Sequence, residues 1–85
     1  MDPVFENVCG FSFKRNRAES VEFFDAWREI AKEDGLNGQK AKMARVVTAR
    51  FDAGNMGLDD ARECIVQIKA GKINNKTQIP GLPAN

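Results

Sequence analysis

The chain has 85 residues, of which 42% are hydrophobic and 29% are charged. This length suits one domain with its own core and is too short for two, and the composition is typical of a folded globular domain rather than a disordered segment. With 13 basic and 12 acidic residues the net charge is +1, so the chain as a whole attracts a polyanion such as DNA only weakly.

The residue types that most enzymes and metal sites need are scarce. There is no histidine, which removes the commonest general base and the usual partner of a Ser or Cys nucleophile. Cys9 and Cys64 are too far apart in sequence for a metal-ligand pair, and we interpret both as reduced thiols, with a disulfide between them as the alternative. We therefore expect no catalytic residue, no metal, no cofactor and no small-molecule substrate.

The sequence also bears on location. It contains no run of about 18 apolar residues that would span a membrane, and its N-terminus lacks the basic-then-apolar pattern of a signal peptide. We expect a cytoplasmic protein without membrane contact.

Residues 1–15 are expected to form an N-terminal arm or a short strand. Phe11 and Phe13 alternate with polar residues as in a strand, but the run is short and Gly10 interrupts it. With Phe5, these aromatic side chains are a large apolar surface for a terminal arm. We expect them to pack on the domain's own core or to contact a partner protein.

The strongest helical pattern predicts a first helix over residues 17–34. Apolar residues recur there at helical spacing and leave a charged opposite face. Asn16 followed by Glu19 resembles a capping box, and Ser20 is a second candidate for the N-cap. Gly35 stands where a residue of left-handed conformation ends a helix.

Two further helices are predicted, over residues 38–53 and 57–70. The first follows Asn37, a favourable N-cap residue, and carries an apolar stripe. The second has Asp59 and Asp60 in its first turn, where carboxylates complement the exposed amide groups and the positive end of the helix dipole.

Residues 74–85 contain Pro80 and Pro83, which exclude a continued helix and predict an extended tail. The helical core is thus expected to comprise residues 16–73 of a single domain, residues 1–85. The predicted fold is all-α: a small three-helix domain with an aromatic N-terminal arm and an extended, proline-containing C-terminal tail.

In the segment from Glu29 to Val47, Ala31 stands four residues before Gly35, and Ala41 and Ala44 follow in the next helix. This spacing resembles the helix-turn-helix motif of DNA-binding domains. In that motif a small residue in the first helix lets the second helix cross closely over it, and a glycine makes the turn four residues later. Ala31 and Gly35 stand at these two positions, and Ala41 and Ala44 fall where the second helix packs inward.

Asp34 and Gly38 depart from the pattern of that family, which usually has an apolar residue at the first position and no glycine at the start of the second helix. Between Gly35 and Phe51, however, every charged residue is basic. The resemblance, with this charge run, implies a DNA-binding regulator whose second helix contacts duplex DNA. The residues expected at that interface are Asn37, Gln39, Lys40, Lys42, Arg45 and Arg50.

A different interpretation of the same corner remains open. A glycine-cornered helical hairpin is a common way to build a small domain, and an acidic and a basic helix can simply complement each other. The protein would then be a protein-protein interaction module or small inhibitor that occupies a partner protein's surface through Phe5, Phe11 and Phe13. A homodimer that placed two basic helices along one face would offset the low net charge.

Overall fold

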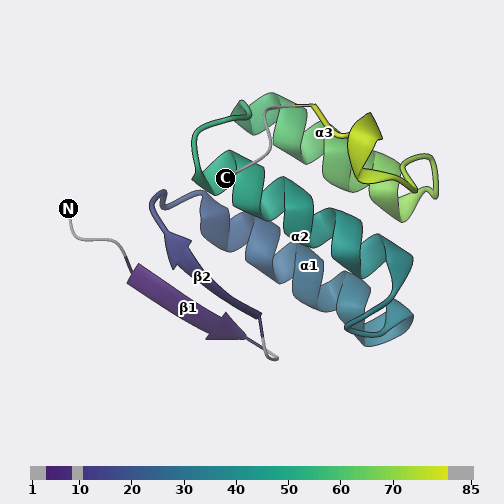
Figure 1. The fold of residues 1–85 in the computed structure, drawn as a ribbon, viewed down its shortest axis with the longest axis horizontal. Coiled ribbons are helices and arrows are strands. Elements are labelled where there is room, and N and C mark those ends of the chain that lie inside the picture. The colour runs from purple at the N-terminus through teal and green to yellow at the C-terminus, as the bar shows by residue number, and fades with distance from the viewer. Residues whose placement is uncertain (1–3, 9–10, 81–85) are drawn as a thin grey trace.

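The computed structural model places a two-stranded hairpin before three helices (Figure 1). It describes residues 4–8 and 11–80, and of the strands only the backbone. The strands are β1 (Val4–Val8) and β2 (Phe11–Arg15), and the helices are α1 (Ser20–Asp34), α2 (Gln39–Asp52) and α3 (Leu58–Lys69), followed by the short 3-10 helix η1 (Lys76–Gln78).

The all-α prediction of three helices is confirmed. Each helix lies inside its predicted range: α2 and α3 begin and end one residue short of it, and α1 begins at Ser20 instead of residue 17. The N-terminal segment forms an antiparallel strand pair in which Phe5 lies opposite Lys14 and Phe11 opposite Val8. None of the helices in the described ranges is long and apolar enough to cross a membrane.

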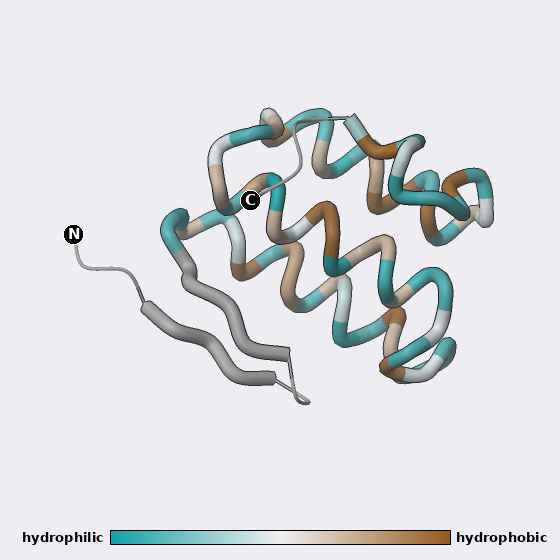
Figure 2. The backbone as a smooth tube through the Cα atoms, viewed as in Figure 1, coloured by the Kyte–Doolittle hydropathy of each residue, from teal (hydrophilic) through white to brown (hydrophobic). Residues whose placement is uncertain are grey.

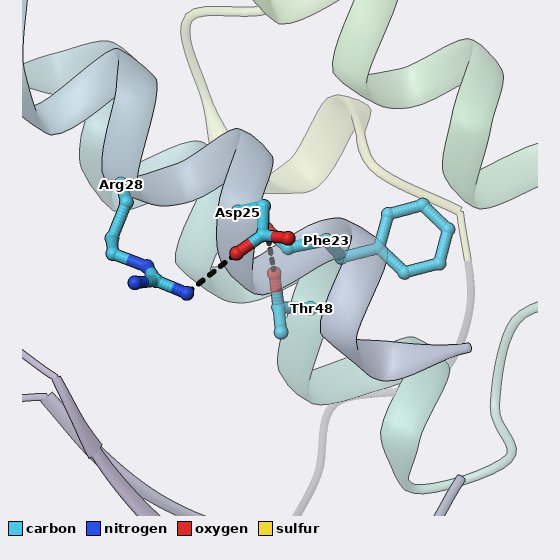
Figure 3. A network of polar contacts seen from close by, with 4 residues as sticks. All are labelled: Phe23, Asp25, Arg28 and Thr48. Carbon is cyan, nitrogen blue, oxygen red and sulfur yellow. Dashed lines mark hydrogen bonds and ion pairs between the residues drawn. The ribbon is translucent and has the colours of Figure 1, made fainter. Parts of the chain in front are cut away.

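Helices α1 and α2 lie side by side in opposite directions (Figure 1). The Ser20 hydroxyl at the start of α1 donates a hydrogen bond to Asp52 Oδ1 at the end of α2, 2.7 Å away. At the same end, the Phe23 and Phe51 rings have their centroids 4.8 Å apart, and the Thr48 hydroxyl of α2 lies 3.4 Å from the Phe23 carbonyl oxygen, a contact drawn in Figure 3. These contacts fasten the first turns of α1 to the last turns of α2.

Helix α3 runs parallel to α1 and antiparallel to α2. Arg62 of α3 forms two hydrogen bonds, of 2.8 and 3.0 Å, to the Glu22 carboxylate near the start of α1. Farther along both helices, Lys69 Nζ lies 4.0 Å from Glu29 Oε2. The up-down-up order brings the end of α1, the start of α2 and the end of α3 together, and we call this the corner end of the bundle.

The core is built from one face of each helix, as the alternating hydropathy along the helices in Figure 2 indicates. Ala41 and Ala44 of α2 are completely buried, and their small side chains let α2 approach its neighbours closely. Ile73 and Ile79 attach the segment after α3 to the same core. The buried hydrophobic residues are Phe23, Phe24, Trp27, Ile30, Ala41, Met43, Ala44, Val47, Phe51, Met56, Ala61, Cys64, Ile65, Ile68, Ile73 and Ile79.

The start of α1 is not capped as predicted. Glu19 is in the N-cap position but makes no side-chain cap, and Ser20 is already the first helical residue. Asn16 is turned toward the end of α2, where its backbone N–H donates to Asp52 Oδ1 at 2.7 Å. Asp52 Oδ1 also accepts from the backbone N–H of Arg17 at 3.2 Å, so a carboxylate from α2 holds the segment that leads into α1.

The predicted cap of α2 is also wrong, because Gly38 and not Asn37 is in the N-cap position. The side-chain acceptor is Asp34, the last residue of α1, whose Oδ2 accepts from the backbone N–H of Lys40 at 2.8 Å and of Ala41 at 3.2 Å. Asp34 departs from the helix-turn-helix pattern for this reason: its carboxylate joins the end of one helix to the start of the next.

Candidate functional site

The residues predicted to contact nucleic acid are not all available at one surface. Helix α2 is the central helix, packed between α1 and α3 (Figure 1). Arg50 is buried and Arg45 is half-buried, while the exposed members of the set are Asn37, Gln39, Lys40 and Lys42.

Two of the exposed residues contact the end of α3 and the segment after it. The Gln39 side-chain amide donates to the carbonyl oxygen of Asn74. Lys40 Nζ donates to the carbonyl oxygen of Lys69, 3.4 Å away, at the end of α3. At the C-terminus of a helix the carbonyl groups lack intrahelical partners, so the ammonium group of Lys40 partly satisfies α3.

The sequence predicts that Arg50 contacts a phosphate of bound DNA, but in the structure its side chain is turned inward. Its side chain is 8% exposed and belongs to the protein interior. Its Nη1 donates to the carbonyl oxygen of Ile79 at 2.7 Å and contacts that of Lys76 at 3.5 Å. A buried guanidinium with these acceptors holds the chain's own C-terminal segment and does not face an external polyanion.

A hollow of about 380 Å³ opens at the corner end of the bundle. It is lined by Glu29, Ile30, Glu33, Asp34, Lys40 and Lys69. Ile30 is buried and forms the apolar part of the lining, whereas the five charged side chains are exposed. Three carboxylates therefore surround the hollow together with two ammonium groups, one of which, that of Lys40, belongs to the predicted nucleic-acid set.

The hollow depends on how tightly the chain turns between α1 and α2. A Cβ atom at Gly38 would lie 2.3 Å from the backbone oxygen of Asp34 and 2.0 Å from its Oδ2. Only a glycine allows this approach without displacing the backbone. Gly35 has a φ of +87°, in the region that favours glycine. Both glycines thus serve the geometry that places Asp34 at the hollow.

Sequence reasoning missed most of the lining. Glu29 and Glu33 look like members of the solvated face of an amphipathic helix, and Lys69 looks like a cation that complements the end of α3. They belong to one surface only because α1 and α3 run parallel and end at the same height. That relation was not visible in the periodicity of either helix.

Outside the hollow, an exposed ion pair with two hydrogen bonds joins Glu22 to Arg62. The hydrogen bonds from Arg62 hold the pKa of the Glu22 carboxyl below its ordinary value. Another pair, Arg28 with Asp25, has Nη2 and Oδ1 2.5 Å apart on α1 (Figure 3). The first pair connects α3 to α1 and the second stays within α1, and in both the charges are matched by the protein's own side chains.

Cys64 of α3 is a free thiol, as predicted, and it is buried. Burial raises the pKa of the thiol above its ordinary value, the nearby carboxylates of Asp60 and Glu63 raise it further, and the positive charge of Arg50 lowers it. A thiol in this state is a weak nucleophile and serves the core. Cys9 lies outside the described residues.

The predicted protein-contact residues Phe5, Phe11 and Phe13 lie in the paired strands. Their side chains are outside the described part of the structure, so their role stays a prediction. Comparisons with protein families, with curated protein sequences and with solved structures found no match to this chain.

Proposed function

We propose that the protein is a small non-enzymatic binding protein that acts by occupying the surface of a partner protein, and that the hollow at the corner end contributes to this interface. The observation that carries the proposal is the lining of the hollow: carboxylates of Glu29, Glu33 and Asp34 stand beside the ammonium groups of Lys40 and Lys69. Charges of both signs around an apolar floor suit the charged and apolar groups of a protein surface.

The same lining is unfavourable for a phosphate backbone. Phosphates approaching Lys40 would also approach Glu33 and Asp34, and repulsion between like charges offsets the attraction. Lys69 in addition lies 4.0 Å from the Glu29 carboxylate, so its charge is already partly compensated. The corner end is thus better suited to a protein than to DNA.

Charge reversal at Glu33 tests the protein-binding proposal. We expect Glu33→Lys to weaken capture of the partner from a nuclease-treated extract at least tenfold, about 1.4 kcal/mol in binding free energy. Glu63→Lys makes the same charge change on the exposed surface of α3 outside the hollow and should leave capture unchanged. Equal loss in both variants, or capture that disappears with nuclease, contradicts the proposal.

A second candidate is the DNA-binding regulator that the resemblance implied, now using the outer side of α2. The observation that favours it is that Lys42 is exposed and that no acidic residue precedes Asp52 in this helix. Asn37, also exposed, lies just before the helix. Side chains at these positions can reach a phosphate backbone without entering the hollow.

A mobility-shift titration with duplex DNA at low salt distinguishes this candidate. We expect the double variant Lys42→Ala with Arg45→Ala to bind more weakly and its affinity to depend less on salt, with the logarithmic slope reduced by roughly two for two lost phosphate contacts. A double variant at Lys32 and Lys72 removes the same charge away from α2. Absence of wild-type binding, or equal losses in both double variants, refutes the candidate.

A further inference from the structure

The segment after α3 folds back over the helices, and we call residues 73–80 the strap (Figure 1). Near its start the Asn74 carbonyl oxygen accepts from Gln39, at the beginning of α2. Near its end the Ile79 carbonyl oxygen accepts from Arg50, close to the end of α2. Ile73 and Ile79 are buried, while every residue between them is exposed. The strap is therefore held at its two ends.

The strap has a structure of its own between these two ends. The Asn75 side-chain oxygen accepts from the backbone N–H of Thr77 at 3.0 Å. The Gln78 side-chain oxygen accepts from the backbone N–H of Asn74 at 2.9 Å and of Asn75 at 3.1 Å. These bonds form a capping box around η1 and do not involve the three long helices. They would persist if the strap left the helices, so it can move as one piece.

Arg50 gives the strap a specific attachment. Both acceptors of its Nη1, the carbonyl oxygens of Lys76 and Ile79, belong to the strap. A buried guanidinium is costly unless its donors are paired. If the strap left the helices, the Arg50 guanidinium would lose those bonds and the site of Ile79 would be uncovered at the same time. The attachment therefore breaks as a unit rather than residue by residue.

Cys64 is positioned to report on such an opening. On α3, Arg62 points toward α1, as its pair with Glu22 shows. Cys64 follows two residues later and is thus turned by roughly 200° about the helix axis, away from α1. Arg50 stands in the same relation to Thr48, one of the α2 residues that contact α1. Cys64, Arg50 and the strap therefore share the side of the bundle remote from α1.

We propose that the strap is a latch that opens and closes as a unit while the three helices stay folded, with the Arg50–Ile79 hydrogen bond and the buried Ile79 side chain as its fastening. Opening uncovers the site of Ile79 and gives solvent access to Cys64. The strap begins at the corner end, but its fastening at Arg50 and Ile79 lies toward the opposite end of α2, and the latch does not depend on the function proposed for the hollow.

Alkylation of the Cys64 thiol with iodoacetamide tests the latch, at fixed pH and increasing urea below the unfolding transition. Mass-spectrometric mapping of the full chain separates Cys64 from Cys9 without a substitution. We expect the native-state rate at Cys64 to be nearly independent of urea, as for a local opening. Ile79→Ala should raise that rate about tenfold while Trp27 fluorescence still reports folded helices.

Ile30→Ala is the matched control, since it truncates a buried isoleucine of α1 and leaves the fastening at Arg50 and Ile79 intact. It should lower global stability and leave the urea-independent rate unchanged. The proposal is overturned if alkylation of Cys64 in the wild-type chain shows the full urea dependence of global unfolding, or if Ile30→Ala and Ile79→Ala accelerate it only in proportion to their effects on global stability. A wild-type measurement alone decides the matter if a variant fails to fold.

Discussion

Replacing Gly38 with Ala is expected to lower the free energy of unfolding by at least about 2 kcal/mol. The new Cβ atom would lie 2.3 Å from the backbone oxygen of Asp34, and a backbone atom at a helix end cannot rotate aside as a side chain can. Relief requires the corner to open, which also draws the Asp34 carboxylate away from the amides of Lys40 and Ala41 that it caps. Equilibrium urea unfolding followed by far-UV circular dichroism measures the loss.

Gly57→Ala is a close control for this experiment. Gly57 is the N-cap residue of α3 with φ −75° and ψ 161°, and Gly38 is the N-cap residue of α2 with φ −67° and ψ 157°. At Gly57, however, the nearest atom to an added Cβ is Asp60 Oδ2 at 3.7 Å, an ordinary contact. We expect Gly57→Ala to cost less than about 1 kcal/mol, the usual effect of a poor N-cap residue. Equal losses at the two glycines would show that steric contact at the corner is unimportant.

The corner also shows what the sequence could and could not predict. A helix, a turn and a second helix followed from periodicity and from Gly35, and the structure confirms both helices. Asp34 and Gly38 appeared as two separate departures from the helix-turn-helix pattern. In the structure they explain each other, because Asp34 caps the second helix and Gly38 leaves room for the close approach. Such a relation requires the three-dimensional path of the turn.

The predictions for the helix starts and for Arg50 failed because they too depend on contacts between residues that are distant in sequence. The apolar residues of a helix recur every three or four positions, so predicting the helices needed only local sequence information. The carboxylate that caps α2 comes from Asp34 on the preceding helix, and the one that holds the start of α1 comes from Asp52, 32 residues beyond Ser20. The basic character of α2 was real, but one of its cations, Arg50, is used inside the protein. Composition alone could not separate a buried cation from an exposed one.

Asp52→Ala is expected to lower the free energy of unfolding by about 3 kcal/mol or more, because it removes the acceptor that several donors share, among them the buried Ser20 hydroxyl. Asp52 is 4% exposed, and its carboxylate accepts from Asn16 and Arg17 as well as from the Ser20 hydroxyl at 2.7 Å. At the end of α2 this negative charge is unfavourable, because it lies at the negative end of that helix's dipole. It is favourable for the N-terminus of α1, which lies against it.

A double-mutant cycle separates this junction from a loss of packing. Ser20→Ala removes one donor and should cost about 1 kcal/mol by itself. In the Asp52→Ala background the same change should cost clearly less, since its acceptor is already gone, and the coupling should reach about 1 kcal/mol. Asp52→Asn keeps one oxygen acceptor and should fall between the wild type and Asp52→Ala. Additive losses, or a cost no greater than that of the exposed Asp59→Ala, would mean that Asp52 does not fasten α1 to α2.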